Sequence, residues 1–429
     1  MKDRELESTD RTFLSKLKRN LLIFFSVFGP ATITAISDND APGVATYSVA
    51  GAKLGYPILF TLIPITILLG VTQEMGVRLS LITRKGLADS IREKYGVKAA
   101  LFMFVSLFIA NLATLVSDFS GIKTVSEMFN IPSVPFVIFI VILIFFFVTK
   151  GNYRLTQAIM LVVAFIYVSY IISAFKAKPD WGTALGNLFY PHGVNFTKDY
   201  LRDYFFIGIS VLGTTITPWG QFFVSSFTSD KKIEPDKVKY IQFEAYCGAF
   251  LTDFFSFFMI VATTATLFVH NIALTSGEEA ALVIRPFAGE LAGILFAIGL
   301  LNAGFMGVSV ISLCTSYAFS EFFGLSGGLD TSFGQSKSFY ILFLAQLIIS
   351  SSVALIPKVS LFHVALISQS INAMSLPFTF YYLIKLTNDK KIMGKYANNP
   401  FKKYFATICT IIIIIASTLA IALTIFSNQ

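Results

Sequence analysis

The residues best suited to chemistry lie in the stretch Ser37–Gly43, which reads Ser-Asp-Asn-Asp-Ala-Pro-Gly. It interrupts an apolar run that opens near Leu21 and resumes after Gly43. An aspartate at the centre of a membrane helix costs about 2.5 to 3.5 kcal/mol, so a pair needs a compensating partner. Pro42 removes a backbone donor and Gly43 tolerates unusual dihedrals, which predicts a lapse in helical hydrogen bonding. Unwound backbone at membrane depth occurs inside protein or beside water, so the pattern predicts a cation site on a broken helix.

A second stretch of this kind runs from Leu212 to Gln221 and reads Leu-Gly-Thr-Thr-Ile-Thr-Pro-Trp-Gly-Gln. Proline, glycine and polar side chains again fall in the middle of an apolar run. A single Pro-Gly kink is common in membrane helices and is weak evidence for function. Two breaks at corresponding positions, one of them with paired carboxylates, are typical of a transporter.

The elements that must position these residues are membrane-spanning helices. Of the 429 residues, 55% are hydrophobic and 14% are charged, and the mean hydropathy is +0.71. A chain of this composition is a polytopic membrane protein. The net charge of +8 comes from short loops and not from one patch, so no nucleic-acid partner is expected. The three cysteines lie in apolar runs without a CxxC pair, so neither a disulfide framework nor a cysteine metal cluster is expected.

Eleven apolar runs are long enough to cross about 30 Å of hydrocarbon. With the amino terminus inside, 25 of the 33 Lys and Arg residues fall on cytoplasmic segments. The positive-inside rule therefore predicts a cytoplasmic amino terminus and an extracellular or periplasmic carboxyl terminus, and the short tails favour a bacterial inner membrane. The runs cover residues 21–52, 56–77, 99–126, 133–149, 155–175, 204–228, 240–269, 286–320, 339–356, 361–386 and 402–426.

The two breaks fall in the first and sixth runs, five spans apart. An odd number of spans per unit inverts the second unit, so we expect a 5+5 inverted repeat whose breaks face each other near the midplane. The expected fold class is an all-α polytopic membrane protein with about eleven transmembrane helices. Its expected segments are a cytoplasmic head at 1–20, a first repeat at 21–175, an extracellular connection at 176–203, an inverted second repeat at 204–386, and a loop with the eleventh helix at 387–429.

The first break resembles a known family. The run from Asp40-Ala41-Pro42-Gly43 to Ala50-Gly51-Ala52 is similar to span one of the NRAMP divalent-metal transporters, whose hallmark is Asp-Pro-Gly-Asn followed by Ala-Gly-Ala. The similarity implies a fold like that of the leucine transporter (LeuT), with helices one and six broken, and transport by alternating access. It continues over nearly the whole chain, at Leu79–Ala88, Ser117-Asp118, Leu295–Gly304, Ser368-Gln369 and Leu376-Pro377-Phe378.

Departures from the family pattern bear on the substrate. The hallmark aspartate falls on Asp40, but the asparagine falls on Gly43, and the Met-Pro-His-Asn of span six reads Thr217-Pro218-Trp219-Gly220. Thr217 thus replaces the metal-binding methionine, and the two span-six histidines fall on Trp219 and Val224. This pattern resembles the NRAMP-related magnesium transporters. A thioether favours softer transition metals, so its loss lowers the preference for manganese and iron over magnesium.

Magnesium dehydrates reluctantly and usually keeps several waters while one or two carboxylates bind it. Small side chains at Gly43, Thr217, Gly220 and Ser375 leave room for those waters. Asp38 could instead cap a half-helix or face a vestibule, and Gln221 could be a packing amide. No cofactor is expected apart from the transported ion, the lipid bilayer is the other partner, and a monomer is compatible with the sequence. The expected metal site comprises Asp40, Asp38, Asn39, Gln221, Gly43, and carbonyls freed near Ala41 and Thr217.

Proton coupling needs titratable relays through the membrane. The three histidines, His192, His270 and His363, lie in an outer loop or at span ends. Asp118 remains in span three, but the acidic residue that the family carries three positions later is Gly121 here. We therefore expect transport driven by the gradient of the ion itself and by the membrane potential, without obligatory protons.

Three alternatives stay open. The main one is a proton-coupled manganese or iron importer of the main NRAMP branch. A divalent-cation channel shares the acidic constriction, although two broken helices favour alternating access. A membrane enzyme is disfavoured because HExxH, GxSxG and phosphate-loop patterns are missing from the sequence. Among other intramembrane polar residues, Glu74 and Arg78 are expected to pair, and Glu244, Asp253 and Asn302 face the bundle interior or the aqueous path.

Overall fold

The computed structural model describes residues 24, 28–150, 153–272, 274, 290–357 and 359–426. Every regular element in these ranges is a helix. The expected head at 1–20 and the first residues of the expected first and eighth spans lie outside the described residues.

All eleven expected spans correspond to helices. By length and composition, seven of the described helical segments can cross a membrane; the remaining spans are the two broken ones, α16 and α18. In chain order the spans are α2 (Pro30–Ser37) with α3 (Ala41–Leu54), η1 (Tyr56–Thr61) with α4 (Leu62–Thr83), α5 (Leu87–Met128), α6 (Ser133–Lys150), α7 (Tyr153–Ala164) with η2 (Phe165–Tyr167) and α8 (Val168–Lys176), α10 (Lys198–Thr215) with α11 (Pro218–Asp230), α12 (Val238–Thr263) with η4 (Thr264–Phe268), α14 (Glu290–Phe323), α15 (Lys337–Ala354), α16 (Leu361–Asn388) and α18 (Pro400–Phe426). The connections contain α9 (Trp181–Asn187), η3 (Pro235–Lys237), α17 (Lys390–Met393) and η5 (Gly394–Tyr396).

The first and sixth spans are broken, as the sequence predicts. Helix α2 ends at Ser37 and α3 begins at Ala41, while α10 ends at Thr215 and α11 begins at Pro218. In each case a proline stands in the first turn of the second half-helix, where its missing N–H is not needed. The residue before each second half-helix, Asp40 or Thr217, caps it with its side chain.

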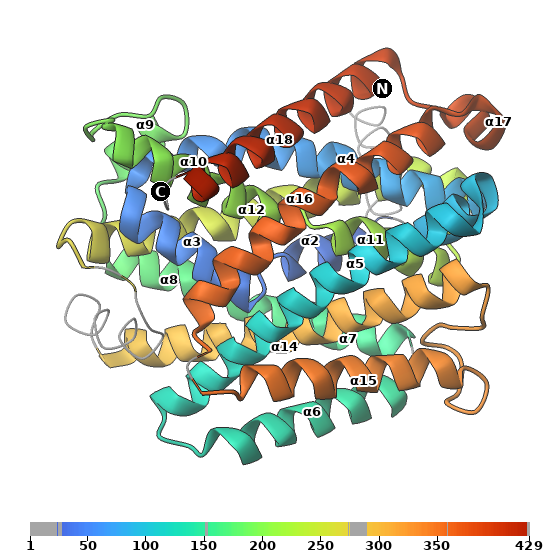
Figure 1. Ribbon diagram of the computed structural model, residues 1–429, viewed down its shortest axis with the longest axis horizontal. Coiled ribbons are helices and arrows are strands. Elements are labelled where there is room, and N and C mark those ends of the chain that lie inside the picture. The colour runs from blue at the N-terminus through green and yellow to red at the C-terminus, as the bar shows by residue number, and fades with distance from the viewer. Residues whose placement is uncertain are drawn as a thin grey trace, which may run out of the picture.

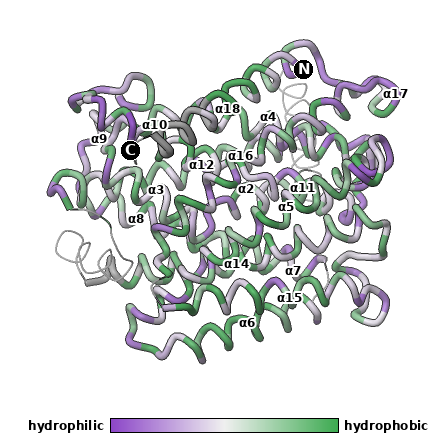
Figure 2. The backbone as a smooth tube through the Cα atoms, viewed as in Figure 1, coloured by the Kyte–Doolittle hydropathy of each residue, from purple (hydrophilic) through white to green (hydrophobic). Residues whose placement is uncertain are grey.

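The broken helices lie in the interior of the bundle. Figure 1 shows α2, α3 and α11 in the middle, with α6 and α15 along one edge and α18 beside α16 at the opposite edge. Figure 2 shows hydrophobic residues along most of α6, whereas hydrophilic residues gather in α17 and the connections. The peripheral helices therefore present apolar surface to lipid, and the polar residues of the breaks are enclosed by protein.

The third span follows a kink within α5. It was expected at 99–126, and α5 begins at Leu87 with a short helical segment that ends at the kink. The backbone departs from helical geometry at Gly96, where φ is 82°, a value that glycine adopts without strain. The turns before Gly96 carry charged residues such as Arg92 and Lys94, and the apolar part of α5 begins after the kink, close to the predicted start.

The expected pair of Glu74 and Arg78 is confirmed and is part of a larger network. Arg78 Nε lies 2.7 Å from Glu74 Oε1, and both side chains are buried. Lys402 of α18 adds a second ion pair, with 2.7 Å between its Nζ and Glu74 Oε2, and Gln242 of α12 donates to Glu74 Oε1 at 2.5 Å. Three spans are thereby joined around one buried carboxylate.

Candidate cation site at the two helix breaks

Asp40 both caps a half-helix and leaves an oxygen available. Its Oδ1 accepts a 2.8 Å hydrogen bond from the Gly43 backbone N–H, which satisfies a free donor of the first turn of α3. Its Oδ2 is buried and has no hydrogen-bond partner within the described part of the chain. A Cβ on Gly43 would come within 2.6 Å of the Asp38 carbonyl oxygen, so only glycine fits the break at this position.

Asp38 connects the two breaks. It follows the last residue of α2, and its Oδ1 accepts a 3.0 Å hydrogen bond from the Thr217 hydroxyl, 179 positions along the chain. The Thr217 Oγ1 in turn accepts from the Gly220 N–H at 3.0 Å and so caps α11. Asp38 Oδ2 is a second buried carboxylate oxygen for which the described residues provide no partner. The predicted juxtaposition of the two breaks is therefore present.

Asp118 of α5 is a third carboxylate at the site, although the sequence analysis did not place it among the ligands. Its Oδ1 accepts a 3.1 Å hydrogen bond from the Ala41 N–H at the start of α3. Its Oδ2 is also buried, with no partner in the ranges that the structure describes. Gly307 of α14 faces this carboxylate so closely that a Cβ there would lie 2.4 Å from Oδ1. The similarity of Ser117-Asp118 to the family was the signal that pointed to this residue.

Amide and hydroxyl groups complete the polar surface. Gln221 of α11 is fully buried, and neither its Oε1 nor its Nε2 has a partner among the described residues. The Thr214 hydroxyl at the end of α10 is in the same state. A buried polar group left without a partner costs about 1 to 3 kcal/mol. Several such groups around one break indicate a site that water or an ion satisfies.

The Asn39 side chain, which was expected to bind metal, is hydrogen-bonded to α12 instead. Its Nδ2 donates to the Thr252 hydroxyl at 2.8 Å, and its Oδ1 accepts from the Ser256 hydroxyl at 2.9 Å. Its backbone carbonyl accepts from the Tyr167 hydroxyl at 2.8 Å. The amide is thus engaged by α12, so in this structure Asn39 holds the break in place and does not point a free oxygen at an ion.

The freed carbonyls are also displaced from the expected positions. Ala41 is the first residue of α3 and Thr217 is the cap of α11, so both carbonyls enter helical hydrogen bonding. The preceding half-helices, α2 and α10, end in the gap with their carboxyl-terminal turns, where the Ala35 and Ile36 carbonyls accept from the Asp38 and Asn39 N–H groups. These two carboxyl-terminal ends carry partial negative charge, which favours a cation in the gap.

The site offers hard ligands. The side chains that it brings together end in carboxylate, amide and hydroxyl groups, which suit magnesium, calcium and manganese. Among the residues described, no three His, Cys, Asp or Glu side chains stand close enough to hold an ion directly between them. The arrangement therefore suits an ion that reaches some of its ligands through water.

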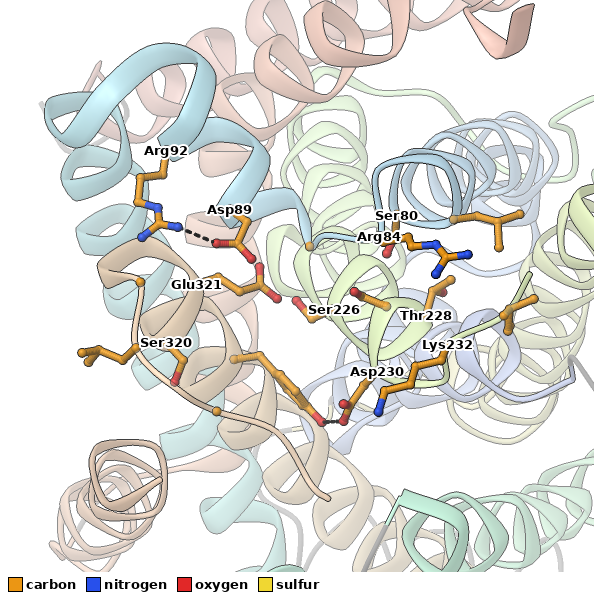
Figure 3. Close-up of a pocket in the computed structure, with 18 residues that line it drawn as sticks. Ser80, Arg84, Asp89, Arg92, Ser226, Thr228, Asp230, Lys232, Ser320 and Glu321 are labelled. Carbon is orange, nitrogen blue, oxygen red and sulfur yellow. Dashed lines mark hydrogen bonds and ion pairs between the residues drawn. The ribbon is translucent and has the colours of Figure 1, made fainter. Parts of the chain in front are cut away.

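A polar cavity of about 600 Å³ lies at the far end of α11 from the break. It is bordered by the end of α4, the start of α5, and the end of α14. Figure 3 shows Ser226, Thr228 and Asp230 of α11 on one side and Glu321 of α14 on the other. The Asp230 carboxylate accepts a 2.6 Å hydrogen bond from the Tyr317 hydroxyl, and Asp89 pairs with Arg92 at 3.0 Å. Helix α11 thus runs from the breaks to a second hydrophilic space.

Comparison with known sequences supports this picture. The family described as "Natural resistance-associated macrophage protein-like" matches residues 31–423. A protein of Caldanaerobacter subterraneus named "Divalent metal cation transporter MntH" is 22% identical over 96% of this chain and 98% of its own length. One of the same name from Bacillus subtilis is 25% identical over 89% of this chain and 87% of its own.

Solved structures share the fold. A manganese transporter of Eremococcus coleocola superposes with a TM-score of 0.75 at 17% identity, covering 95% of this chain and 89% of that one. MhsT in complex with L-phenylalanine superposes with a TM-score of 0.60 at 15% identity, covering 91% and 96%. The resemblance to both is one of fold, and it is the LeuT-like fold that the family resemblance implies.

Proposed function

This chain belongs to the Natural resistance-associated macrophage protein-like (NRAMP) family and is a divalent metal cation transporter, and from that premise we propose that its main cargo is Mg²⁺, with Mn²⁺ also carried. Asp40, Asp38 and Asp118 hold the ion, and the Gln221 amide and the Thr217 hydroxyl complete the set of oxygen ligands. The sequence pattern at Thr217-Pro218-Trp219-Gly220 supports the proposal, because it resembles that of the NRAMP-related magnesium transporters.

One observation carries this proposal. Each of the three carboxylates uses Oδ1 for a protein hydrogen bond and keeps a buried Oδ2 without a partner among the described residues. An ion that binds all three directly would need them gathered tightly, and the described residues contain no such group. Mg²⁺ retains several waters when bound by carboxylates, so it can bridge oxygens that are too far apart for direct contact.

The absence of a soft ligand in the aligned position supports magnesium over manganese. The resemblance puts Thr217 where the family has its metal-binding methionine, and the Thr217 hydroxyl donates to Asp38 and accepts from the Gly220 N–H, which leaves one lone pair for an ion. Unlike a thioether sulfur, a hydroxyl oxygen does not favour a soft metal over a hard one. Discrimination against the more abundant Mg²⁺ is thereby weakened.

Transport proceeds by alternating access. Asp38, Asp40 and Asp118 are 0% exposed, so the site is closed and must be opened by movement of the half-helices. On one side, release leads along α11 to the cavity that contains Ser226 and Asp230. The amino terminus is cytoplasmic, the carboxyl terminus is outside, and residues 21–175 and 204–386 form the two inverted repeats of this mechanism.

We propose that proton movement is not obligatory. Of the three histidines, His192 lies between α9 and α10, and His363 lies at the start of α16 with an exposed side chain. In proteoliposomes that report internal pH, Mg²⁺ uptake is expected without a fixed number of protons per ion. Proton influx in constant proportion to metal uptake would contradict this part of the proposal.

A second candidate is a proton-coupled manganese importer. The relative from Eremococcus coleocola is described as a manganese transporter, and this favours the candidate. Competition separates the two. Uptake of Mn²⁺ that is blocked by millimolar Mg²⁺ supports a magnesium transporter, whereas Mn²⁺ uptake indifferent to Mg²⁺ supports the manganese importer. Unitary currents far above carrier turnover would instead indicate a channel.

A further inference from the structure

The half-helix α2, which ends beside Asp38, depends on another helix for its amino-terminal cap. Gly29, the residue before α2, has a φ of 138° and supplies no side-chain hydrogen bond. The N–H groups of Gly29 and Thr32 both donate to Glu244 Oε1 of α12, each at 2.9 Å. A carboxylate is well suited to this place, because free N–H groups and the helix dipole make a helix start positive.

The other end of α2 is held by the same helix. Asn39, in the break, exchanges hydrogen bonds with Thr252 and Ser256 of α12. Between the two ends the backbones nearly touch, since a Cβ on Gly248 of α12 would lie 3.0 Å from the Ala31 carbonyl oxygen. Helix α12 therefore contacts α2 at its start, along its length, and just beyond its end.

Two side chains from other elements donate hydrogen bonds to the residue before the cap. Gln157 of α7 and Lys231, just after α11, donate to the Phe28 carbonyl at 2.7 and 2.6 Å. The Glu244 bonds differ in position, because they reach the cap and the first turn of α2 itself and are accepted by a buried side chain. Glu244 thus fixes α2 itself, and through α2 the position of Asp38.

We propose that Glu244 is a positioning residue for transport, fastening α2 to α12 so that Asp38 meets Thr217 across the breaks. The proposal rests on Asp38 being a cation ligand, as proposed above, but it does not depend on which divalent cation is carried. Glu244 lies 212 positions from Thr32 and does not itself belong to the cation site.

The test uses full-length protein in proteoliposomes, with Cys247, Cys314 and Cys409 replaced by serine and Thr34→Cys as a reporter. Thr34 is buried in α2, and its Cγ2 lies 3.6 Å from the Cβ position of Gly220 in α11. A membrane-impermeant thiol reagent therefore reports loosening of α2. Initial rates of Mg²⁺ and of Mn²⁺ uptake are measured in parallel over a range of concentrations.

Glu244→Ala removes two hydrogen bonds to α2. It is therefore expected to raise the labelling rate at Thr34→Cys about tenfold and KM for both cations about tenfold. The maximal rate of uptake should change less. Glu244→Gln keeps an acceptor oxygen and is expected to stay within about threefold of the parent in both measurements. Asp253→Asn is the matched control. It alters another buried acid on α12, bonded at 2.5 Å to Thr66 of α4, and should leave labelling of α2 unchanged.

Parental labelling and KM in a folded Glu244→Ala protein would overturn the proposal. An equal rise in labelling with Asp253→Asn would also overturn it, since loosening would then follow from any lost acid in α12. If Glu244→Ala fails to fold, the test uses Glu244→Gln. A labelling rate raised well beyond threefold in Glu244→Gln without a rise in KM would show that Glu244 does not position Asp38 for cation binding. A parent protein that labels as expected but takes up no cation refutes the proposed function and not the anchoring.

Discussion

At the scale of single residues, Asp38, Asp40 and Asp118 divide their oxygens between the protein and the site. One oxygen of each fixes a hydroxyl or backbone N–H of a neighbouring element, and the other is buried without a partner in the described residues. A carboxylate whose orientation is already fixed loses little entropy when it binds an ion. Substitutions at these positions should therefore affect binding more than their number of contacts suggests.

Asp40→Ala is expected to abolish Mg²⁺ and Mn²⁺ uptake, because it removes both the free carboxylate oxygen and the cap of α3. Radioactive or fluorescent flux in proteoliposomes measures this. Asp180→Ala is a matched control, since Asp180 caps α9 through the same kind of bond, from the Thr183 N–H to its Oδ1 at 3.1 Å, but lies in the connection between α8 and α10. Normal uptake by Asp40→Ala would refute the proposed site.

Thr217→Met is expected to shift preference towards Mn²⁺ and Cd²⁺, because the thioether adds a soft ligand at the second break. It also removes the cap of α11 and the bond to Asp38, at a cost of about 1 kcal/mol in stability. Calorimetry with each cation measures the shift. Thr217→Ser keeps the hydroxyl and should keep the cation preference of the parent protein. A shift of equal size in Thr217→Ser would show that the thioether sulfur does not cause the shift in Thr217→Met.

At the scale of elements, the Glu74 network joins α4, α12 and α18 at one face of the bundle. Arg78→Ala is expected to lower thermal stability by about 3 kcal/mol, since it leaves a buried carboxylate with Lys402 as its remaining cation among the described residues. Lys85→Ala is the comparison, because the Lys85 pair with Glu93 is exposed and is worth about 0 to 1 kcal/mol. Thermal unfolding in detergent should separate the two, and equal melting temperatures would contradict the network.

Local sequence predicted the elements well where the signal is short-ranged. The breaks were predictable because Pro42 and Pro218 interrupt apolar runs, and a proline disrupts only its own helix. The pair of Glu74 and Arg78 was predictable from a spacing of one helical turn.

Contacts between distant segments were not predictable in this way. Asn39 turns to Thr252 and Glu244 caps α2, pairings that span more than 200 positions. Periodicity shows which face of a helix is polar, but not which neighbour it meets. Asp118 was recognised through family resemblance, yet its bond to Ala41 depends on how α5 packs beside α3.

At the scale of the whole molecule, uptake should respond to membrane potential. A divalent cation that moves without compensating protons transfers two charges, and each is worth about 2.3 kcal/mol per 100 mV. An inside-negative potential, set by potassium and valinomycin in proteoliposomes, is expected to accelerate Mg²⁺ uptake, while a pH gradient alone does not drive it. Uptake that follows the pH gradient and ignores the potential would favour the proton-coupled candidate.

The closed state of the site has a consequence for the cell that makes this protein. Because Asp38, Asp40 and Asp118 are wholly enclosed, this conformation offers sodium and potassium no continuous aqueous route past the breaks. A cell can therefore keep many copies in its membrane without a standing leak through this conformation.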